Sequence, residues 1–313
     1  LGFYGSYEMQ IFQDRLQVTL GGRGDQISVQ NDVGLNPLYE VTDGVRNDTP
    51  AGQKVLWQSR KASDRSWSLN LGLLYHLSPK LGLTLNGARA FRSPFLEERY
   101  QYIDLGSLVR VGDPDLQPEK ARFIDAGLRF QGQRIIVSTN IFLNQLYDMV
   151  AEIPGTYEDR KALLKTNIGK AQLYGWEMRT DLRLSAASSL YLSSTWIKGE
   201  DIWLDKPLPQ IPPFSGTLGL VLPVGRLGSL DMQATFFADQ ERLAAGEIRT
   251  PGYGVCDLYF NSATVPFLSV NGRFLLGMEN IVNRSYRNHL ATNRGLVVQE
   301  PGRNVIAGWA MDF

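Results

Sequence analysis

The stretch YGWEMRTDLRL (174–184) carries a charge at every second position. Successive side chains of a β-strand point to opposite faces, so this spacing predicts a strand with one charged and one apolar face. The charged face holds Glu177, Arg179, Asp181 and Arg183. The apolar face holds Trp176, Met178, Thr180, Leu182 and Leu184. A soluble sheet with its apolar side inward and a membrane sheet with its apolar side outward both fit this pattern, so the remaining strands must decide.

Period-two alternation recurs along the whole chain, and helical periodicity is weak throughout. The pattern predicts about thirteen strands, over residues 1–11, 15–29, 67–78, 81–93, 121–131, 134–150, 167–184, 189–198, 214–222, 229–239, 253–264, 268–281 and 304–313. Most of these segments are longer than the strands of globular sheets. Many of them are long enough to cross a bilayer as tilted strands.

The connections between these strands alternate between short and long. The short ones are 13–15, 79–80, 132–134, 185–188, 224–228 and 265–267, and the long ones are 30–66, 94–120, 151–166, 199–213, 240–252 and 282–303. One end of an up-and-down sheet is therefore trimmed to turns, as in outer-membrane barrels. The chain is predicted to be all-β and to form part of an antiparallel transmembrane β-barrel. Its apolar faces would meet lipid, and Glu177, Arg179, Asp181 and Arg183 would line a wet lumen. A soluble two-sheet protein with inverted faces is the alternative.

Composition and single residues exclude several classes of function. The chain has 32 basic and 32 acidic residues, so it lacks the basic surplus of nucleic-acid-binding proteins. No run of apolar residues is long enough for a transmembrane helix. Cys256 is the single cysteine and suits an apolar strand position. His76 and His289 lie at opposite ends of the predicted sheet, so no metal site is expected. With no G-x-S-x-G motif and one loop histidine, an enzyme is not predicted either.

Several longer stretches resemble one family. The chain ends in GWAMDF, where Trp309, Met311 and Phe313 share a face, and this resembles the C-terminal signal that the barrel-assembly machinery recognises in bacterial outer-membrane proteins. ARAFRSPFLEERY (88–100) and GDPDLQPEKARFIDAGLRF (112–130) resemble the paired boxes of TonB-dependent outer-membrane receptors. NIGKAQLYGWEMRTDLRL (167–184), PQIPPFSGTLGL (209–220), GMENIVNRSYRNHL (277–290) and EPGRNV (300–305) resemble further segments of the same receptors, in the same order.

The resemblance implies a location and an architecture. Such receptors lie in the outer membrane of Gram-negative bacteria, surrounded by its lipid, and form 22-stranded barrels around an N-terminal plug. The thirteen predicted strands match the last thirteen of that barrel. We therefore expect residues 1–313 to be the C-terminal part of the barrel, with the plug and the first strands lacking a counterpart in this chain. Coupling to the TonB–ExbB–ExbD complex would need the plug. No cofactor is expected.

The resemblance also implies TonB-dependent uptake of a ligand bound by the long loops, for which a ferric siderophore or a similar metal chelate is predicted. Arginine and tyrosine suit an anionic aromatic ligand, through charge-assisted hydrogen bonds and stacking. The candidate residues are Arg92, Glu98, Arg99, Tyr100, Tyr102, Arg110, Trp203, Tyr286, Arg287 and His289. A haem or cobalamin receptor of the same family remains an alternative, although 93–112 lacks the histidine that haem receptors carry there. A passive porin-like channel is the other.

Overall fold

The structure is a computed structural model that describes residues 1–267, 270–293 and 296–312. Among the described residues, thirteen long strands form an antiparallel meander in which each strand pairs with the next. They are β1 (Gly2–Ile11), β2 (Leu16–Asn31), β7 (Arg60–Ser78), β8 (Leu81–Arg92), β11 (Glu119–Gln131), β12 (Ile135–Tyr157), β13 (Arg160–Arg183), β14 (Ser189–Asp201), β16 (Ser215–Val224), β17 (Gly228–Phe237), β18 (Tyr253–Ser262), β20 (Val270–Glu279) and β23 (Asn304–Asp312). All thirteen predicted strands are confirmed over the described residues, and positions 268, 269 and 313 of the last two predicted strands lie outside them.

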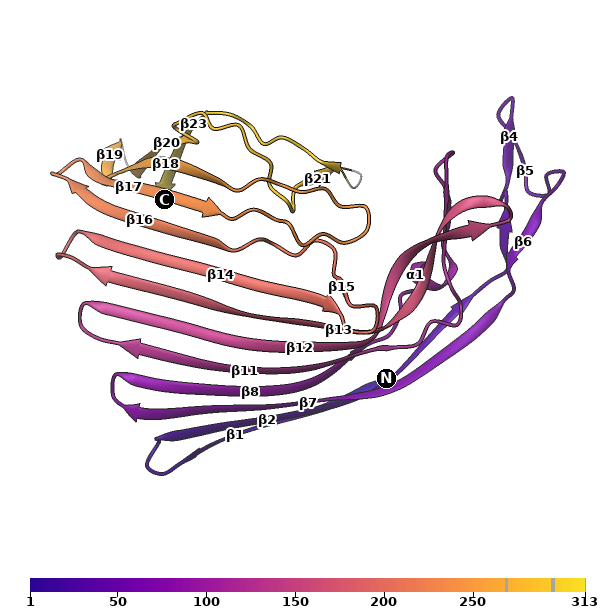
Figure 1. Ribbon diagram of the computed structural model, residues 1–313, viewed down its shortest axis with the longest axis horizontal. Helices are drawn as coiled ribbons and strands as arrows, with labels where there is room; N and C mark the ends of the chain where they lie inside the picture. Colours follow the sequence, from indigo (N-terminus) through magenta and orange to yellow (C-terminus); the bar gives the residue numbers. More distant parts are fainter. Residues whose placement is uncertain (268–269, 294–295, 313) are drawn as a thin grey trace.

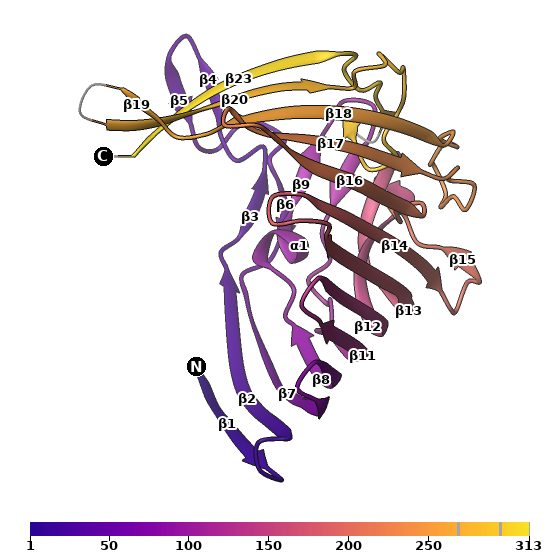
Figure 2. The ribbon, with the colours of Figure 1, turned by 90° about the vertical axis from the view of Figure 1, so that its left-hand side faces the viewer.

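The meander curls into an open trough, with β1 and β23 at its two edges (Figures 1 and 2). Over the described residues, β1 pairs with β2 alone and β23 with β20 alone, so the sheet does not close on itself. No helix in the described part of the chain is long and apolar enough to span a bilayer.

The strand register gives the sheet one polar and one apolar face, as predicted. On the polar face, Asn140 pairs with Glu177, and Glu177 pairs with Thr195 on the next strand. One residue along, a row of the apolar face consists of Leu85, Ala126, Ile141, Trp176 and Trp196. Ile141 is 61% exposed, although its side chain is wholly apolar. An apolar row of this kind, exposed or partly exposed at every position, suits contact with lipid, and the charged side chains of 174–184 lie on the opposite face of the sheet.

The two ends of the trough differ as the sequence predicts, and Figure 1 shows tight turns at one end and large loops at the other. We call these the short-turn end and the long-loop end. The prediction that 151–166 forms a long loop is wrong. Instead β12 and β13 stay paired up to Tyr157 and Arg160, and the two-residue turn between them places Glu158 and Asp159 at φ of 46° and 61°. The β12–β13 hairpin therefore extends beyond the neighbouring strands at the long-loop end, and we call this part the raised hairpin.

The long loops contain short elements of their own. Segment 94–120 forms α1 (Leu96–Tyr100), β9 (Tyr102–Asp104) and β10 (Val109–Val111), and β10 pairs in parallel with the raised part of β13. Segment 30–66 contains the extensions of β2 and β7 together with β3 (Gly34–Asn36), β4 (Glu40–Thr42), β5 (Val45–Asn47) and β6 (Lys54–Trp57). The remaining short strands are β15 (Lys206–Pro207), β19 (Val265–Phe267), β21 (Thr292–Asn293) and β22 (Leu296–Val297).

A small buried core lies in these loops. Val109 and Val111 of β10 pack with Ala162 of β13, and each is less than 5% exposed. Trp57 of β6 and Tyr157 of β12 pack against this cluster. Burial of these side chains fixes the 94–120 segment against the raised β12–β13 hairpin, which positions the first group of candidate residues.

Candidate functional site in the long loops

The structure separates the candidate loop residues into two groups and one isolated residue. The first group surrounds α1, β9 and β10 and consists of Arg92, Glu98, Arg99, Tyr100, Tyr102 and Arg110. The second group lies between β20 and β23 and consists of Tyr286, Arg287 and His289. Trp203 stands between β14 and β15.

Arg92 is held by two carboxylates at the top of β8. Its Nε and Nη2 donate to the two carboxylate oxygens of Glu119 at 2.6 Å each, and its Nη1 donates to Glu98 Oε2 at 2.7 Å. Burial would raise the pKa of Glu98, but hydrogen bonds from Arg92 and from the Phe95 amide bring this pKa below its usual value. Glu98 therefore stays ionised, and these hydrogen bonds join β8, α1 and β11.

Arg99 and Tyr100 lie inside the loops. Arg99 is 3% exposed, and its Nη2 donates to Asp64 Oδ2 at 2.9 Å while its Nη1 donates to the Pro114 carbonyl at 2.9 Å. The Tyr100 ring packs edge-on against Trp57, with the ring centroids 6.1 Å apart. These two side chains join 94–120 to β7 and β6, so they stabilise the folded loop from its interior.

Tyr102 and Arg110 connect the same segment to the raised hairpin. The Tyr102 ring lies 6.0 Å from that of Tyr157, centroid to centroid. Arg110 Nη2 is 3.1 Å from Glu152 Oε2, and Lys165 Nζ is 3.3 Å from the other oxygen of this carboxylate. Arg110 remains partly open to solvent, since 43% of its side chain is exposed.

A salt bridge at the tip of this group joins β9 to β13. Arg160 Nη1 and Nη2 donate to the two oxygens of Asp104 at 2.6 and 2.7 Å. The hydrogen bonds from Arg160, together with one from the Gly106 amide, lower the pKa of Asp104 to about 2. The carboxylate is therefore charged at any ordinary pH.

Tyr286 and Arg287 line a cavity of about 310 Å³ that we call the tyrosine pocket. The Tyr253 ring stacks on Phe237, 4.8 Å between centroids, and on Tyr286, 4.3 Å between centroids. Phe237 and Tyr253 are cross-strand partners on the polar face of the sheet. The pocket is lined by Pro251, Gly252, Tyr253, Arg284, Ser285, Tyr286, Arg287 and Gln299.

The charges around the tyrosine pocket are mostly positive. Within the described residues, neither Arg284 nor Arg287 has a carboxylate at ion-pair distance. Burial raises the pKa of the Tyr286 phenol, and the nearby Glu300 raises it further. The phenol therefore stays protonated at neutral pH and can donate a hydrogen bond. The arrangement offers a stacked aromatic wall, a phenolic donor and two guanidinium groups that can bind an anion.

His289 follows Tyr286 and Arg287 in the same loop and is 4% exposed. Its Nδ1 is 3.1 Å from Thr250 Oγ1, and its Nε2 is 3.6 Å from Glu247 Oε1. Glu247 also accepts hydrogen bonds from the amides of Gln210 and Ala244. His289 thus joins the 240–252 and 282–303 loops and is closed to solvent.

The other predicted sites lie apart from these loops. Trp203 is 78% exposed, and its ring lies over Gly169, where an added Cβ would collide with it. On the polar face, Arg179 donates to both oxygens of Asp181 at 3.0 Å. Trp309 and Met311 share the apolar face, and Phe313 lies outside the described residues. No cluster of three or more metal-ligating side chains occurs in the described part of the chain.

Two important residues of the pocket were not among the candidates. Tyr253 begins β18, and its ring is stacked by a residue from a loop far along the chain, which no local pattern indicates. Arg284 precedes Tyr286 by two positions, so its place in the same predicted loop could have identified it as a candidate.

Comparison with known proteins gives consistent results. Residues 1–281 match the family model described as TonB dependent receptor-like, beta-barrel. The structure is similar to the copper transporter OprC, with a TM-score of 0.78, 22% identity, and coverage of 98% of this chain and 46% of that chain. It is also similar to the FrpB iron transporter of Neisseria meningitidis, with a TM-score of 0.70, 17% identity, and coverage of 98% and 44%.

Two further relatives are more distant or partial. The ferric enterobactin receptor PfeA gives a TM-score of 0.64 at 14% identity, covering 98% of this chain and 53% of that chain. Transferrin-binding protein A of Neisseria meningitidis serogroup B is 28% identical over 132 residues, which are 42% of this chain and 14% of that protein. The chain thus spans about half the length of these solved structures. Because the family model matches most of the sequence, the chain belongs to the β-barrel family of TonB-dependent receptors.

Proposed function

We propose that this chain is part of an outer-membrane receptor for a metal chelate, with a ferric siderophore of the catecholate type as the favoured ligand. The observation that carries the proposal is the tyrosine pocket. It combines a stack of aromatic rings with two arginines that have no carboxylate partner among the described residues. The pocket lies at the long-loop end, on the polar face of the sheet.

The chemistry of the pocket suits a ferric catecholate. Such a complex is anionic and presents flat aromatic rings, so guanidinium groups can bind its oxygens while tyrosine rings stack on it. The protonated phenol of Tyr286 supplies a neutral donor in addition. Two of the similar structures are an iron transporter and a ferric enterobactin receptor, which supports iron chelates as cargo.

The first group of candidate residues has a supporting role in this proposal. Arg92, Glu98, Arg99 and Tyr100 are engaged by other protein groups, whereas Arg110 and Trp203 keep exposed surface and could contact a large ligand. Energy for uptake would come from TonB–ExbB–ExbD through the plug domain that the family resemblance implies. The barrel-assembly machinery would recognise the C-terminal face with Trp309, Met311 and Phe313.

The proposal can be tested with the product of the complete gene, in a strain that lacks its other iron receptors. We expect ferric enterobactin to quench the intrinsic fluorescence of the purified receptor and to support uptake of radioactive iron. The double variant Arg284→Gln/Arg287→Gln should bind about 100-fold more weakly, because each lost charge-assisted hydrogen bond weakens binding about tenfold. Tyr286→Phe keeps the stack and loses the donor, so a smaller loss is expected.

The matched control is Arg46→Gln, which removes an arginine from the exposed β4–β5 hairpin of the same long-loop end. Its binding should equal that of the unmodified receptor. Binding of haem or cobalamin in place of ferric enterobactin would overturn the catecholate assignment. Passage of small solutes without any bound chelate would favour a passive channel.

A further inference from the structure

The apolar face of the sheet becomes basic towards the long-loop end. Above the row that contains Ile141 and Trp176, the next cross-strand row is Gly87, Ile124, Leu143, Tyr174 and Lys198. The row after that is Arg89, Arg122, Gln145, Gln172 and Glu200. The last row is Phe91, Lys120, Tyr147 and Lys170. We call Arg89, Lys120, Arg122, Lys170 and Lys198 the basic rim.

Two cations of the basic rim are neutralised by carboxylates, and three are not. Lys120 Nζ is 3.0 Å from Asp148, and Lys198 Nζ is 2.7 Å from Glu200. Within the described part of the chain, Arg89, Arg122 and Lys170 have no carboxylate partner. The rim therefore carries an excess of positive charge on the lipid-facing side.

The three unneutralised cations lie over aromatic rings. The Arg89 guanidinium is 3.6 Å from the centroid of the Trp67 ring, and it also donates to the Trp67 carbonyl. Arg122 and Lys170 approach the single ring of Tyr147, each at 5.3 Å from its centroid. Two cations beside one ring repel each other, and an anion bound between them would relieve that repulsion.

The level of these rings indicates the kind of anion. Tryptophan and tyrosine gather where the hydrocarbon of a bilayer gives way to its head groups. Ile124 and Leu143, one row below the cations, are apolar, as lipid tails require. An anion bound at Arg89 and Arg122 therefore lies at the depth of lipid head groups, directly above hydrocarbon.

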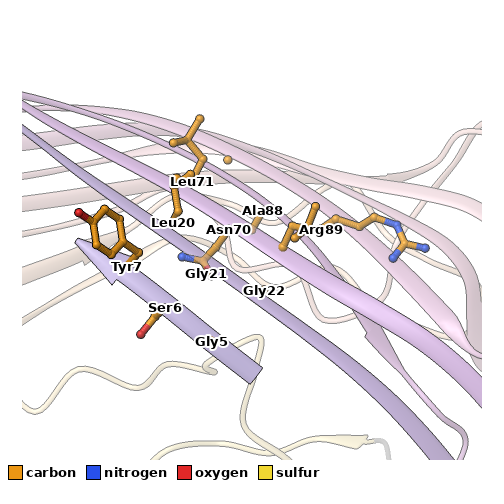
Figure 3. Close-up of a pocket in the computed structure, with 12 residues that line it drawn as sticks. Gly5, Ser6, Tyr7, Leu20, Gly21, Gly22, Asn70, Leu71, Ala88 and Arg89 are labelled. Carbon is orange, nitrogen blue, oxygen red and sulfur yellow. The ribbon is translucent and has the colours of Figure 1, made fainter. Parts of the chain in front are cut away.

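A hollow on the same face lies next to Arg89. It has a volume of about 710 Å³ and spans β1, β2, β7 and β8. Gly5 and Gly22 leave it open, and a Cβ at Gly5 would meet nothing within 4 Å. Figure 3 shows Tyr7, Leu20 and Leu71 at one side of these glycines and the long side chain of Arg89 at the other. An acyl chain can lie in such a hollow while its head group reaches Arg89.

We propose that the basic rim and this hollow form a site for a membrane lipid with an anionic, phosphorylated head group. Arg89 and Arg122 would bind phosphate oxygens, for which the guanidinium fork is well suited. Lys170 would add charge, and the hollow would hold part of an acyl chain. This site lies on the opposite face of the sheet from the tyrosine pocket, so it does not depend on the identity of the transported ligand.

The test uses the receptor from the complete gene in nanodiscs of phosphatidylcholine, with fluorescent lipid A as the phosphorylated probe. The double variant Arg89→Gln/Arg122→Gln should bind the probe about 25-fold more weakly, since each basic residue near an anionic membrane surface contributes about fivefold. Arg122→Lys keeps the charge and should retain most of the affinity. Binding should also weaken with added salt, because these cations are near solvent.

The matched control is Lys80→Gln/Arg226→Gln, which removes two exposed cations from turns at the short-turn end. Probe binding by this control should be unchanged. Heat-modifiable mobility on gels verifies that each variant has folded. An equal loss of lipid A binding in the control would overturn the site. Equal affinity for fluorescent phosphatidylcholine and fluorescent lipid A would overturn it as well. Equal affinity for inorganic phosphate alone would show that no lipid is required and would overturn the lipid assignment.

Discussion

Arg99 illustrates how strongly one residue can hold a loop. Its buried guanidinium bonds to Asp64 on β7 and to the Pro114 carbonyl, so Arg99→Met leaves the Asp64 carboxylate without its counter-charge. Breaking a buried ion pair in this way costs about 3–5 kcal/mol. We expect segment 96–116 to open more often, with amide hydrogen exchange at least 100-fold faster over these residues.

The comparison for this prediction is Arg60→Met. Arg60 Nη1 joins the same strand to Asp115 at 2.7 Å, but both side chains are more than half exposed. Water and salt screen such a pair, so its loss should leave exchange over 96–116 nearly unchanged. Equal acceleration in the two variants would contradict a special role for burial at Arg99.

Residue type indicated which loops hold the candidate residues, but it did not indicate which of these side chains are engaged by other protein groups. Arginine and tyrosine in 92–110 suggested ligand contact, yet Arg92 and Arg99 are bound by Glu119 and Asp64, which lie 27 and 35 positions away in the chain. Such pairings depend on the strand register, which a single sequence does not specify. The tyrosine pocket could not be predicted for the same reason. Tyr253 begins β18 and Tyr286 lies in the loop after β20, and only the folded sheet brings their rings together.

At the scale of elements, the raised β12–β13 hairpin is what the sequence analysis missed. Pro154 and Gly155 interrupt the strand pattern there, and the turn residues Glu158 and Asp159 lack the glycine that two-residue turns with positive φ favour. The pairing persists because the core residues on β10 add to the edge of β13. Tertiary contact therefore outweighs the local turn signal.

The Asp104–Arg160 bridge makes the tip of this hairpin sensitive to acid. The folded pKa of Asp104 is about 2, below the value of about 4 that an unfolded aspartate has. A lowered pKa stabilises the folded tip above about pH 4, and this contribution disappears as pH falls towards 2. Amide exchange over 102–111, corrected for the intrinsic effect of pH, should lose protection in this window.

Asp104→Asn provides the control for the acid response of the tip. An asparagine cannot ionise, so the variant should be less protected at neutral pH and should show no further loss between pH 4 and 2. The unmodified tip would contradict the prediction if it lost protection near pH 6, because Asp104 remains fully charged there.

At the scale of the whole molecule, alternation along strands and alternation between loops were sufficient to predict the fold. Both signals repeat over every strand, so an error at one element does not alter the architecture. The sequence also predicted which face is charged, and the register places Glu177 beside Asn140 and Thr195 on that face. A sheet with lipid on one side and water on the other, as is typical of this family, would have one apolar and one charged face, because each face must match its own solvent.

Two adjacent residues of β12 test this assignment of faces. Ile141 belongs to the apolar face, whereas Asn140 lies on the polar face with its amide 3.1 Å from Asp125. Ile141→Arg should lower the unfolding free energy of the complete receptor in phosphatidylcholine vesicles by about 2–4 kcal/mol, the usual cost of arginine on a lipid-facing strand near mid-membrane. Asn140→Arg should change it little, because Asp125 and Glu177 can pair with the new charge. Urea titration followed by tryptophan fluorescence measures both, and a larger loss for Asn140→Arg would mean that the faces are reversed.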